Sequence, residues 1–123
     1  MKQTIRILIA DDRTPSRNGL KALLDTEAEV ELVGEATDGQ EVVQLVGEYR
    51  PDVVLMDIRM PVMNGLEATR IIKDRWPEVR VIVLTMYPSY QCDALAAGAD
   101  AFLLKGCEAE ELFEAIFNTT DNE

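Results

Sequence analysis

The chain has 123 residues, enough for one domain that buries roughly two thirds of its unfolded surface, and too few for a second domain. Its 23 acidic and 12 basic residues give a net charge of −11, and the resulting field repels nucleic-acid phosphates and anionic membrane surfaces. No stretch approaches the roughly 20 apolar residues that a membrane helix needs. We therefore expect a single cytoplasmic domain over residues 1–123 that contacts neither nucleic acid nor membrane directly.

Short apolar runs alternate along the chain with longer segments of helical periodicity, which is the pattern of a repeated βα unit. Five such units are present, and the predicted strands span 5–10, 31–36, 53–56, 81–84 and 101–104. The third run is apolar without alternation, as expected for a central parallel strand covered on both faces. The pattern predicts an α/β fold with a five-stranded parallel sheet and right-handed connections.

Local signals mark where the helices begin and end. Thr14 is predicted to cap the first helix, with Pro15 at the first helical position. A later helix must stop near Trp76 because Pro77 follows it. The last helix is predicted over 108–118, with acidic residues near its positive N-terminal end.

Cys92 and Cys107 are isolated thiols without CxxC spacing, and the chain has no histidine. Neither a zinc site nor a redox pair is indicated. We expect two free, reduced cysteines.

Polar residues stand where the apolar runs end: Asp11 and Asp12 after the first, Asp57 after the third, Thr85 after the fourth and Lys105 after the fifth. The ends of parallel strands meet at one edge of the sheet, so these side chains are expected to converge. Two carboxylates about 5 Å apart repel by roughly 3 kcal/mol at an effective dielectric near 20, so the cluster needs a cation. Hard oxygen ligands suit Mg2+, although an acidic pair alone is more often a cap or turn.

Asp57 is the more specific signal, because a carboxylate held rigidly at the end of a buried strand can act as a nucleophile and form an acyl phosphate. The metal and the Lys105 ammonium would neutralise charge on the transferred group, and Thr85 would bond one of its oxygens. Taken singly, Thr85 is better explained as a strand-end hydroxyl and Lys105 as a solvated cation. Their joint placement at matching strand ends favours the phosphoryl-transfer interpretation.

Four motifs stand out along the chain: Ile9-Ala10-Asp11-Asp12, Met56-Asp57-Ile58-Arg59-Met60-Pro61 with Asn64-Gly65, Leu84-Thr85, and Gly98-Ala99-Asp100-Ala101-Phe102-Leu103-Leu104-Lys105. On these motifs the chain resembles a response-regulator receiver domain of two-component signalling from Ile5 to about Phe117, and segments such as Leu84-Thr85-Met86 are similar to the NarL/FixJ subfamily. The resemblance implies a doubly wound, flavodoxin-like sheet of order 2-1-3-4-5 with five helices.

The resemblance also implies roles at the site. Asp57 would be the phosphoacceptor, and Mg2+ would be held by Asp12, Asp57 and the backbone carbonyl of Arg59, with Asp11 acting mainly through a metal-bound water. The donor would be a phosphohistidine on a histidine kinase or phosphotransfer protein.

Thr85 and Lys105 would hold the phosphoryl oxygens, and movement of Thr85 would let Phe102 reorient toward the core as a two-state switch. The resemblance implies a regulatory phosphoacceptor rather than an enzyme, limited to its own slow phosphorylation and dephosphorylation. Members of the subfamily usually carry a C-terminal helix-turn-helix output domain that regulates transcription. We expect no output domain within this chain, which is either excised from a longer transcription factor or a stand-alone protein.

Several positions depart from the family pattern. Thr85 and Lys105 lie closer together than is usual, which predicts a short or frayed fourth helix and weak order from Met86 to Ala94. Phe102 stands where many members have Tyr. Lys105 is followed by Gly106 rather than the common proline, so the isomer of that peptide bond is open.

Two pairs of residues carry further hypotheses. Arg59 and Tyr87 stand two positions beyond Asp57 and Thr85, where family side chains border the path of the attacking water, so we expect them to influence the lifetime of the acyl phosphate. Phe113 and Phe117 on the last helix form either a homodimer contact or part of a wide core stripe.

Three other functions compete with this interpretation. A haloacid-dehalogenase-like phosphatase needs a second Asp two positions after the nucleophile, where this chain has Arg59. A flavodoxin-like cofactor binder needs a hydroxyl-rich phosphate loop, whereas the loop here begins Asp11-Asp12-Arg13. A degenerate receiver that binds partners without phosphorylation remains the alternative.

Overall fold

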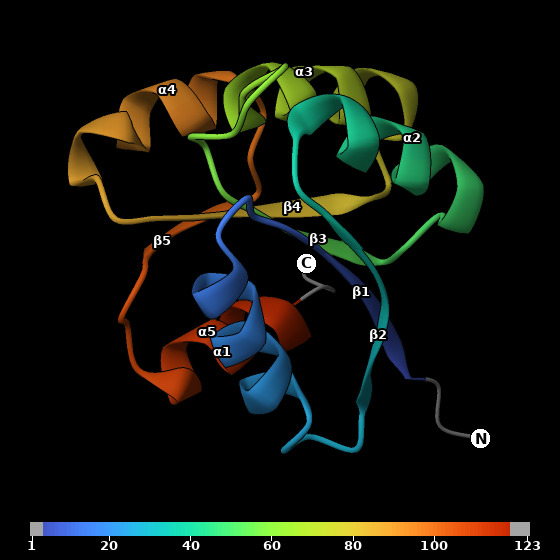
Figure 1. Cartoon of the computed structure of the whole chain (residues 1–123), viewed down its shortest axis with the longest axis vertical. Helices are drawn as coiled ribbons and strands as arrows, with labels where there is room; N and C mark the ends of the chain where they lie inside the picture. The colour runs from blue at the N-terminus through green and yellow to red at the C-terminus, as the bar shows by residue number, and fades with distance from the viewer. Residues whose placement is uncertain (1–3, 119–123) are drawn as a thin grey trace.

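The computed structural model describes residues 4–118 as a parallel sheet between two layers of helices (Figure 1). The five strands pair in the order β2-β1-β3-β4-β5, and each neighbouring pair is parallel. The strands are β1 (Ile5–Ala10), β2 (Val30–Ala36), β3 (Val53–Met56), β4 (Arg80–Thr85) and β5 (Ala101–Leu104). The predicted strand order is thus confirmed, and each predicted strand agrees with the structure to within one residue at either end.

Helices α2, α3 and α4 cover one face of the sheet, and α1 and α5 cover the other (Figure 1). Their bounds are α1 (Thr14–Leu24), α2 (Gly39–Tyr49), α3 (Gly65–Arg75), α4 (Gln91–Ala96) and α5 (Ala109–Phe117), with a short 3-10 helix η1 (Pro88–Tyr90) before α4. The fourth helix is short, as predicted, with 6 residues. Pro88 stands in the first turn of η1 and fixes where this helical segment begins.

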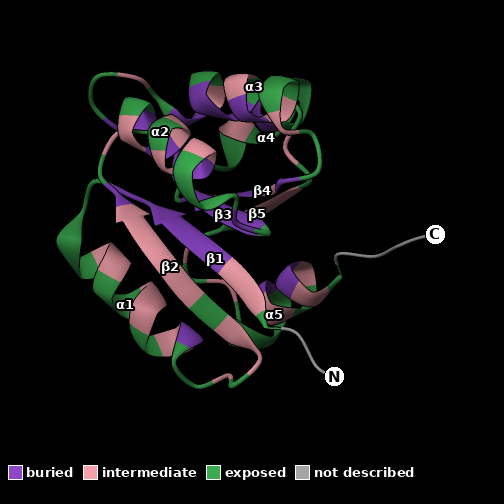
Figure 2. Ribbon diagram, turned by 90° about the vertical axis from the view of Figure 1, so that its right-hand side faces the viewer, coloured by how far each residue is buried: buried purple, intermediate pink, exposed green. Residues whose placement is uncertain are grey.

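Two apolar clusters hold the layers together, because alternate residues of the central strands point to opposite faces. Leu8 and Val54 belong to the cluster under α2 and α3, whereas Ile9 and Leu55 belong to the cluster over α1 and α5. Figure 2 shows the carboxyl-terminal part of β1 fully buried, while the edge strand β2 is mostly half-buried. Because the central strands are buried on both faces, the residues at their carboxyl ends are held in fixed positions.

Phe113 and Phe117 lie half-buried against the second cluster, with ring centroids 6.1 Å apart. This packing agrees with the wide core stripe of the two alternatives for the last helix. It leaves partial exposure on both rings.

Main-chain hydrogen bonds align the carboxyl ends of the strands. Asp57 N donates to Ala10 O at 2.9 Å, and Lys105 N donates to Thr85 O at 2.7 Å. One edge of the sheet therefore carries all of the predicted site residues: Asp11 and Asp12 after β1, Asp57 after β3, Thr85 at the end of β4 and Lys105 after β5.

Two expectations about the backbone are settled by the structure. The Thr14 cap is wrong: α1 begins at Thr14 itself, and the capping position is Arg13, whose side chain makes no cap hydrogen bond. The reason is that the Arg13 N–H is bound to Asp11 Oδ1, which sets the entry of the chain into the helix. The Lys105–Gly106 peptide is trans, and Gly106 has φ of 89°, a left-handed conformation that favours glycine.

Both cysteines are free thiols, Cys92 exposed and Cys107 half-buried, as expected. Among residues 4–118, no helix combines the length and the apolar character needed to cross a bilayer.

Candidate functional site

Asp57 follows β3, the central strand, and its side chain is nearly buried, with 7% of the residue exposed. Its Oδ1 accepts the N–H of the next residue, Ile58, at 2.8 Å, and this bond holds the carboxylate in one orientation. The start of α3 packs against the same turn, because Gly65 N donates to Ile58 O at 2.8 Å. A Cβ at Gly65 would lie 1.9 Å from Asp57 O, so only glycine permits this approach.

Lys105, directly after β5, links two carboxylates of the cluster. Its Nζ lies 2.8 Å from Asp11 Oδ2 and 3.1 Å from Asp57 Oδ2. The ammonium thus stands between the two buried acids and offsets their mutual repulsion.

Asp11 is buried, with 1% exposure, and both of its oxygens are occupied. Oδ1 accepts the Arg13 N–H at 3.0 Å. Oδ2 accepts from Ser16 Oγ at 2.5 Å in addition to Lys105. Three protein donors therefore hold this carboxylate, and one of its roughly four acceptor positions is left for a further donor.

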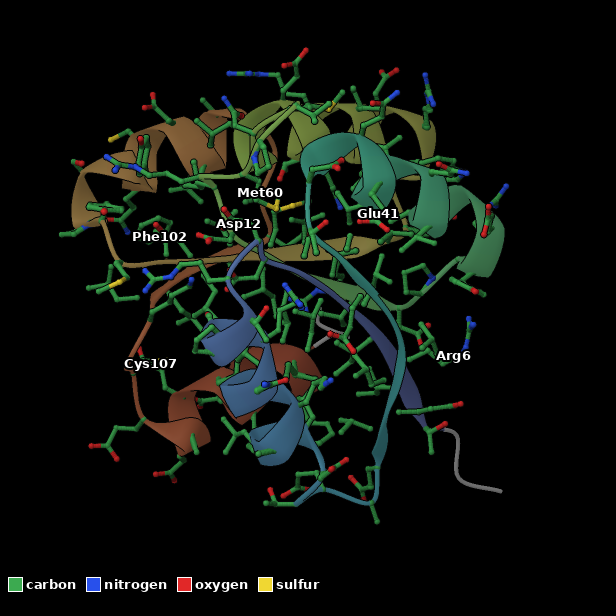
Figure 3. All side chains as sticks on the ribbon, in the orientation of Figure 1. Arg6, Asp12, Glu41, Met60, Phe102 and Cys107 are labelled. Atoms are coloured by element: carbon green, nitrogen blue, oxygen red, sulfur yellow. The ribbon has the colours of Figure 1, made fainter. Side chains whose placement is uncertain are left out.

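Unlike the buried Asp11, Asp12 is exposed, at the turn after β1. Phe102 of β5 lies to one side of it (Figure 3). Within residues 4–118 its carboxylate has neither a hydrogen-bond nor an ion-pair partner, and no donor bonds to the carbonyl oxygen of Arg59. One oxygen each of Asp11, Asp12 and Asp57 lies within 4.8 Å of the other two. Hard, anionic oxygens at this spacing, among them the unpartnered carboxylate of Asp12, fit Mg2+ better than a soft metal.

A small hollow opens over the carboxylates, lined by Asp12, Arg13, Asp57, Arg59, Met86, Tyr87 and Lys105. It contains both an unpartnered carboxylate and the Lys105 cation. This is the chemistry of a site for a metal-bound anion.

The pKa values in this cluster diverge. Burial raises the pKa of the Asp57 carboxyl above its usual 3.8, and the charge of Asp11 adds to the rise, while Lys105 opposes it without cancelling it. Burial acts on Asp11 in the same direction, but hydrogen bonds outweigh it and its pKa lies below 3.8. The donors of these bonds are Lys105, Ser16 and the Arg13 N–H. Burial alone would lower the pKa of Lys105, yet its bond to Asp11 and the charge of Asp57 raise it above 10.5.

Thr85 ends β4 at the same edge and is buried, with 1% exposure. Its Oγ1 accepts the Tyr87 N–H at 3.3 Å, so in this state the hydroxyl satisfies the backbone of the following loop. The Phe102 ring is half-buried against the cluster under α2 and α3. Both predicted switch residues therefore have one defined arrangement here.

Two sets of contacts at this site were not anticipated from the sequence. The Arg59 guanidinium stacks over the Tyr87 ring at 3.9 Å from its centroid and lies 6.0 Å from that of Tyr90. Ser16 donates to Asp11 from the first turns of α1. The available signal for Ser16 was its place near the start of a helix that closely follows Asp11, whereas nothing local indicated the stacking.

The protein-family model named response regulator receiver domain matches residues 7–117 of this chain. The chain belongs to this family. The transcriptional regulatory protein DegU of Brevibacillus brevis is 46% identical over 114 residues, covering 91% of this chain and 48% of that protein. The transcriptional regulatory protein LnrK of Bacillus subtilis is 40% identical over 114 residues, and the match covers 91% of this chain and 52% of that protein.

Solved structures agree with this assignment. A DNA-binding response regulator of the LuxR family from Staphylococcus aureus has a TM-score of 0.87 at 31% identity, with 95% of this chain and 99% of that one covered. The signal receiver domain of NarL from Mycobacterium tuberculosis has a TM-score of 0.88 at 31% identity, with 94% and 95% covered. These relatives confirm the predicted receiver of the NarL/FixJ-like subfamily, within two-component systems and transcription regulation. This receiver spans about half the length of the curated relatives it matches.

Proposed function

We propose that this receiver accepts a phosphoryl group on Asp57 from a phosphohistidine of a histidine kinase or phosphotransfer protein, with Mg2+ bound beside it. The observation that carries the proposal is the Lys105 ammonium between Asp11 and Asp57, next to the unpartnered carboxylate of Asp12. A structural salt bridge would need no free anionic ligand beside it. The free ligand is what a metal-dependent site requires.

In this proposal Asp12, Asp57 and the Arg59 carbonyl hold the ion, and Asp11 contacts it through water. Bound Mg2+ would neutralise negative charge on the phosphoryl oxygens. The unpartnered Asp12 carboxylate and the unpartnered Arg59 carbonyl oxygen support this division, as do the three protein donors on Asp11. These residues form an all-oxygen set, as the ion prefers.

Asp57 is the nucleophile: its carboxylate oxygen forms a new P–O bond as the P–N bond of the phosphohistidine breaks, and the released imidazole takes a proton from solvent. The Ile58 N–H holds Oδ1, so Oδ2, now bound to Lys105, is the oxygen available for attack. Lys105 then turns from the carboxylates to a phosphoryl oxygen. The pKa of Lys105, held above 10.5, keeps this group charged at neutral pH.

The output step proposed here is a rearrangement of Thr85 and Phe102. A phosphoryl oxygen would take the Thr85 hydroxyl from the Tyr87 N–H, and the half-buried Phe102 would move further into the core. The rearranged face would bind a C-terminal helix-turn-helix domain in a longer protein. The partly exposed Phe113 and Phe117 would bind a second copy of the receiver. Sedimentation with and without a phosphoryl mimic tests the dimer: an unchanged mass, together with no effect of Phe113→Glu, removes it.

The decisive experiment is incubation with a small phosphodonor and Mg2+, followed by intact-mass measurement. A gain of one phosphoryl group that is lost in Asp57→Ala supports the proposal. Asp74→Ala, at an exposed position of α3, is the matched control and should keep the gain. No gain at saturating donor would instead favour a degenerate receiver that binds partners without phosphorylation.

A further inference from the structure

Ser16 lies near the start of α1 with its hydroxyl against the carboxylate cluster. Ser16 Oγ donates to Asp11 Oδ2 at 2.5 Å, and the same oxygen accepts Lys105 Nζ at 2.8 Å. Within residues 4–118, Ser16 is the only hydroxyl side chain that bonds to a carboxylate of Asp11, Asp12 or Asp57. Asp11 Oδ2 therefore has one donor at the end of a long lysine side chain and one, a short serine hydroxyl, on a helix.

The helix that carries Ser16 is itself tied to the strand ends. Arg17 Nη1 donates to the Asp11 carbonyl at 2.9 Å, and Arg17 Nε donates to Glu35 Oε1 of β2 at 3.1 Å. Lys21 binds the other oxygen of Glu35 at 3.1 Å. Because these contacts fix α1 relative to the backbone of Asp11, the Ser16 hydroxyl is held at a constant place beside the carboxylate.

This arrangement matters when Lys105 leaves Asp11. In the proposed function Lys105 turns to the phosphoryl group, and Asp11 then loses its ion pair while buried to 99%. The Arg13 N–H remains on Oδ1, and only Ser16 remains on Oδ2. With both donors the carboxylate plane stays fixed; with the Arg13 N–H alone it would be free to rotate about that bond.

We infer that Ser16 is a positioning residue of the metal site, which orients the Asp11 carboxylate toward the metal-bound water and holds it there after Lys105 has moved. The inference rests on the proposed function, since it assigns Ser16 a role toward Mg2+. Groups that hydrogen-bond to a metal's ligands typically change metal affinity by 10–100-fold, and Ser16 acts one step further out, through Asp11, so we expect the lower end of that range at most. Ser16 is thus expected to act on Mg2+ affinity rather than on the fold.

The test is calorimetric titration with Mg2+ alone, without phosphodonor, of the receiver and of its Lys105→Met variant, in which Asp11 has lost the ion pair with Lys105. In the Lys105→Met background Ser16→Ala should weaken Mg2+ binding by up to about 10-fold, and Ser16→Thr, which keeps a hydroxyl, should bind nearly as well as Lys105→Met alone. Ser16→Val has the shape of Thr without its hydroxyl and should behave like Ser16→Ala. Thr26→Ala is the matched control, because Thr26 is exposed beyond the other end of α1 and its hydroxyl donates only to Leu23 O.

Thermal unfolding in chelator should give equal midpoints for Ser16→Thr and Ser16→Val within a few degrees, so that affinity differences report on the hydroxyl. If the Thr and Val variants bind Mg2+ equally well, the role of Ser16 is overturned, whatever the behaviour of Ser16→Ala. If the parent receiver takes up no Mg2+ at all, the proposed function fails, and that result is distinct from a failure of the Ser16 role.

Discussion

Lys105 and Asp11 form the shortest ion pair in the described part of the chain, with 2.8 Å between Nζ and Oδ2. Their side chains are 16% and 2% exposed, so water screens the pair only weakly. The ammonium stands among the carboxylates that would surround a divalent ion. Lys105 is therefore a tethered cation that stabilises the cluster when no metal is bound.

Replacing Lys105 by Met should destabilise the metal-free receiver by about 1–3 kcal/mol, because it leaves two buried carboxylates without their cation. The pKa of Lys105 is raised in the fold above 10.5, so its stabilising contribution is complete below pH 10.5 and is lost as the pH rises through the folded value. Urea unfolding in chelator should show a constant deficit from pH 7 to 9 that shrinks above about pH 10.5. Excess Mg2+ should reduce the deficit.

Lys21→Met is the control for this series, since Lys21 pairs with Glu35 at a more exposed position. It should cost at most about 1 kcal/mol, and Mg2+ should not change that cost. A Lys105→Met protein as stable as the parent in chelator would show that the ion pair does not stabilise the cluster.

Asp57→Asn is expected to stabilise the metal-free receiver at neutral pH, by on the order of 1 kcal/mol, because it removes a buried charge beside Asp11. The pKa of Asp57 is raised above 3.8, so its ionisation costs stability above the folded pKa, and the cost vanishes as the pH falls below 3.8. The gain should therefore be present at pH 7 and absent at low pH. Thermal melts in chelator across this range measure it.

Excess Mg2+ should reverse the order of the two proteins, because the parent binds the ion with a charged carboxylate where the Asn variant offers only a neutral amide oxygen. A variant that is less stable than the parent in chelator at pH 7 contradicts this prediction.

Gly65→Ala should destabilise the receiver by roughly 2–4 kcal/mol, because the added Cβ meets the main-chain oxygen of Asp57 at 1.9 Å and nothing flexible can move away. Gly19→Ala is the matched control: Gly19 lies in α1 and a Cβ there meets nothing within 4 Å. It should stabilise by about 0.5–1 kcal/mol through helix propensity. Denaturant unfolding of both variants measures the contrast, and equal effects would show that α3 can shift away from Asp57.

The positions of the strand ends could be predicted from the sequence, because each apolar run is bounded by polar residues. The fifth strand, for example, lies between Asp100 and Lys105, and its prediction needed no correction. The convergence of Asp11, Asp57 and Lys105 follows from this pattern and from parallel pairing alone. The strands and the acidic cluster are thus consequences of periodicity, whereas the order of the strands in the sheet came from the family resemblance.

The contacts within the cluster depend on loop conformation, which periodicity does not determine. Asp11 accepts the Arg13 N–H, and the capping position of α1 is therefore Arg13 and not the predicted Thr14. The stack of Arg59 on Tyr87 joins two loops that are distant in sequence, so no local spacing could reveal it. Side-chain partners are where the sequence alone was insufficient.

Hydrogen exchange should be faster in the segment from Met86 to Ala94 than in α5. The segment contains η1 and the first turn of a short α4, whose only buried residue is Ala94, whereas α5 buries Leu112 and Ile116. Few buried contacts mean a low free energy of local opening. Equal protection in the two segments would refute the predicted weak order.

The same experiment tests the stack of Arg59 on the tyrosine rings. Arg59→Ala removes the cation 3.9 Å from the Tyr87 centroid and should speed exchange around η1 roughly two- to fivefold, because the β4–α4 segment loses its tie to the loop after β3. Arg70→Ala, at an exposed position of α3, is the matched control and should leave this segment unchanged. If Arg59→Ala leaves exchange around η1 at the parent rate, the stack does not hold the segment, and any effect of Arg59 on the acyl-phosphate lifetime must then arise within the hollow over Asp57 itself.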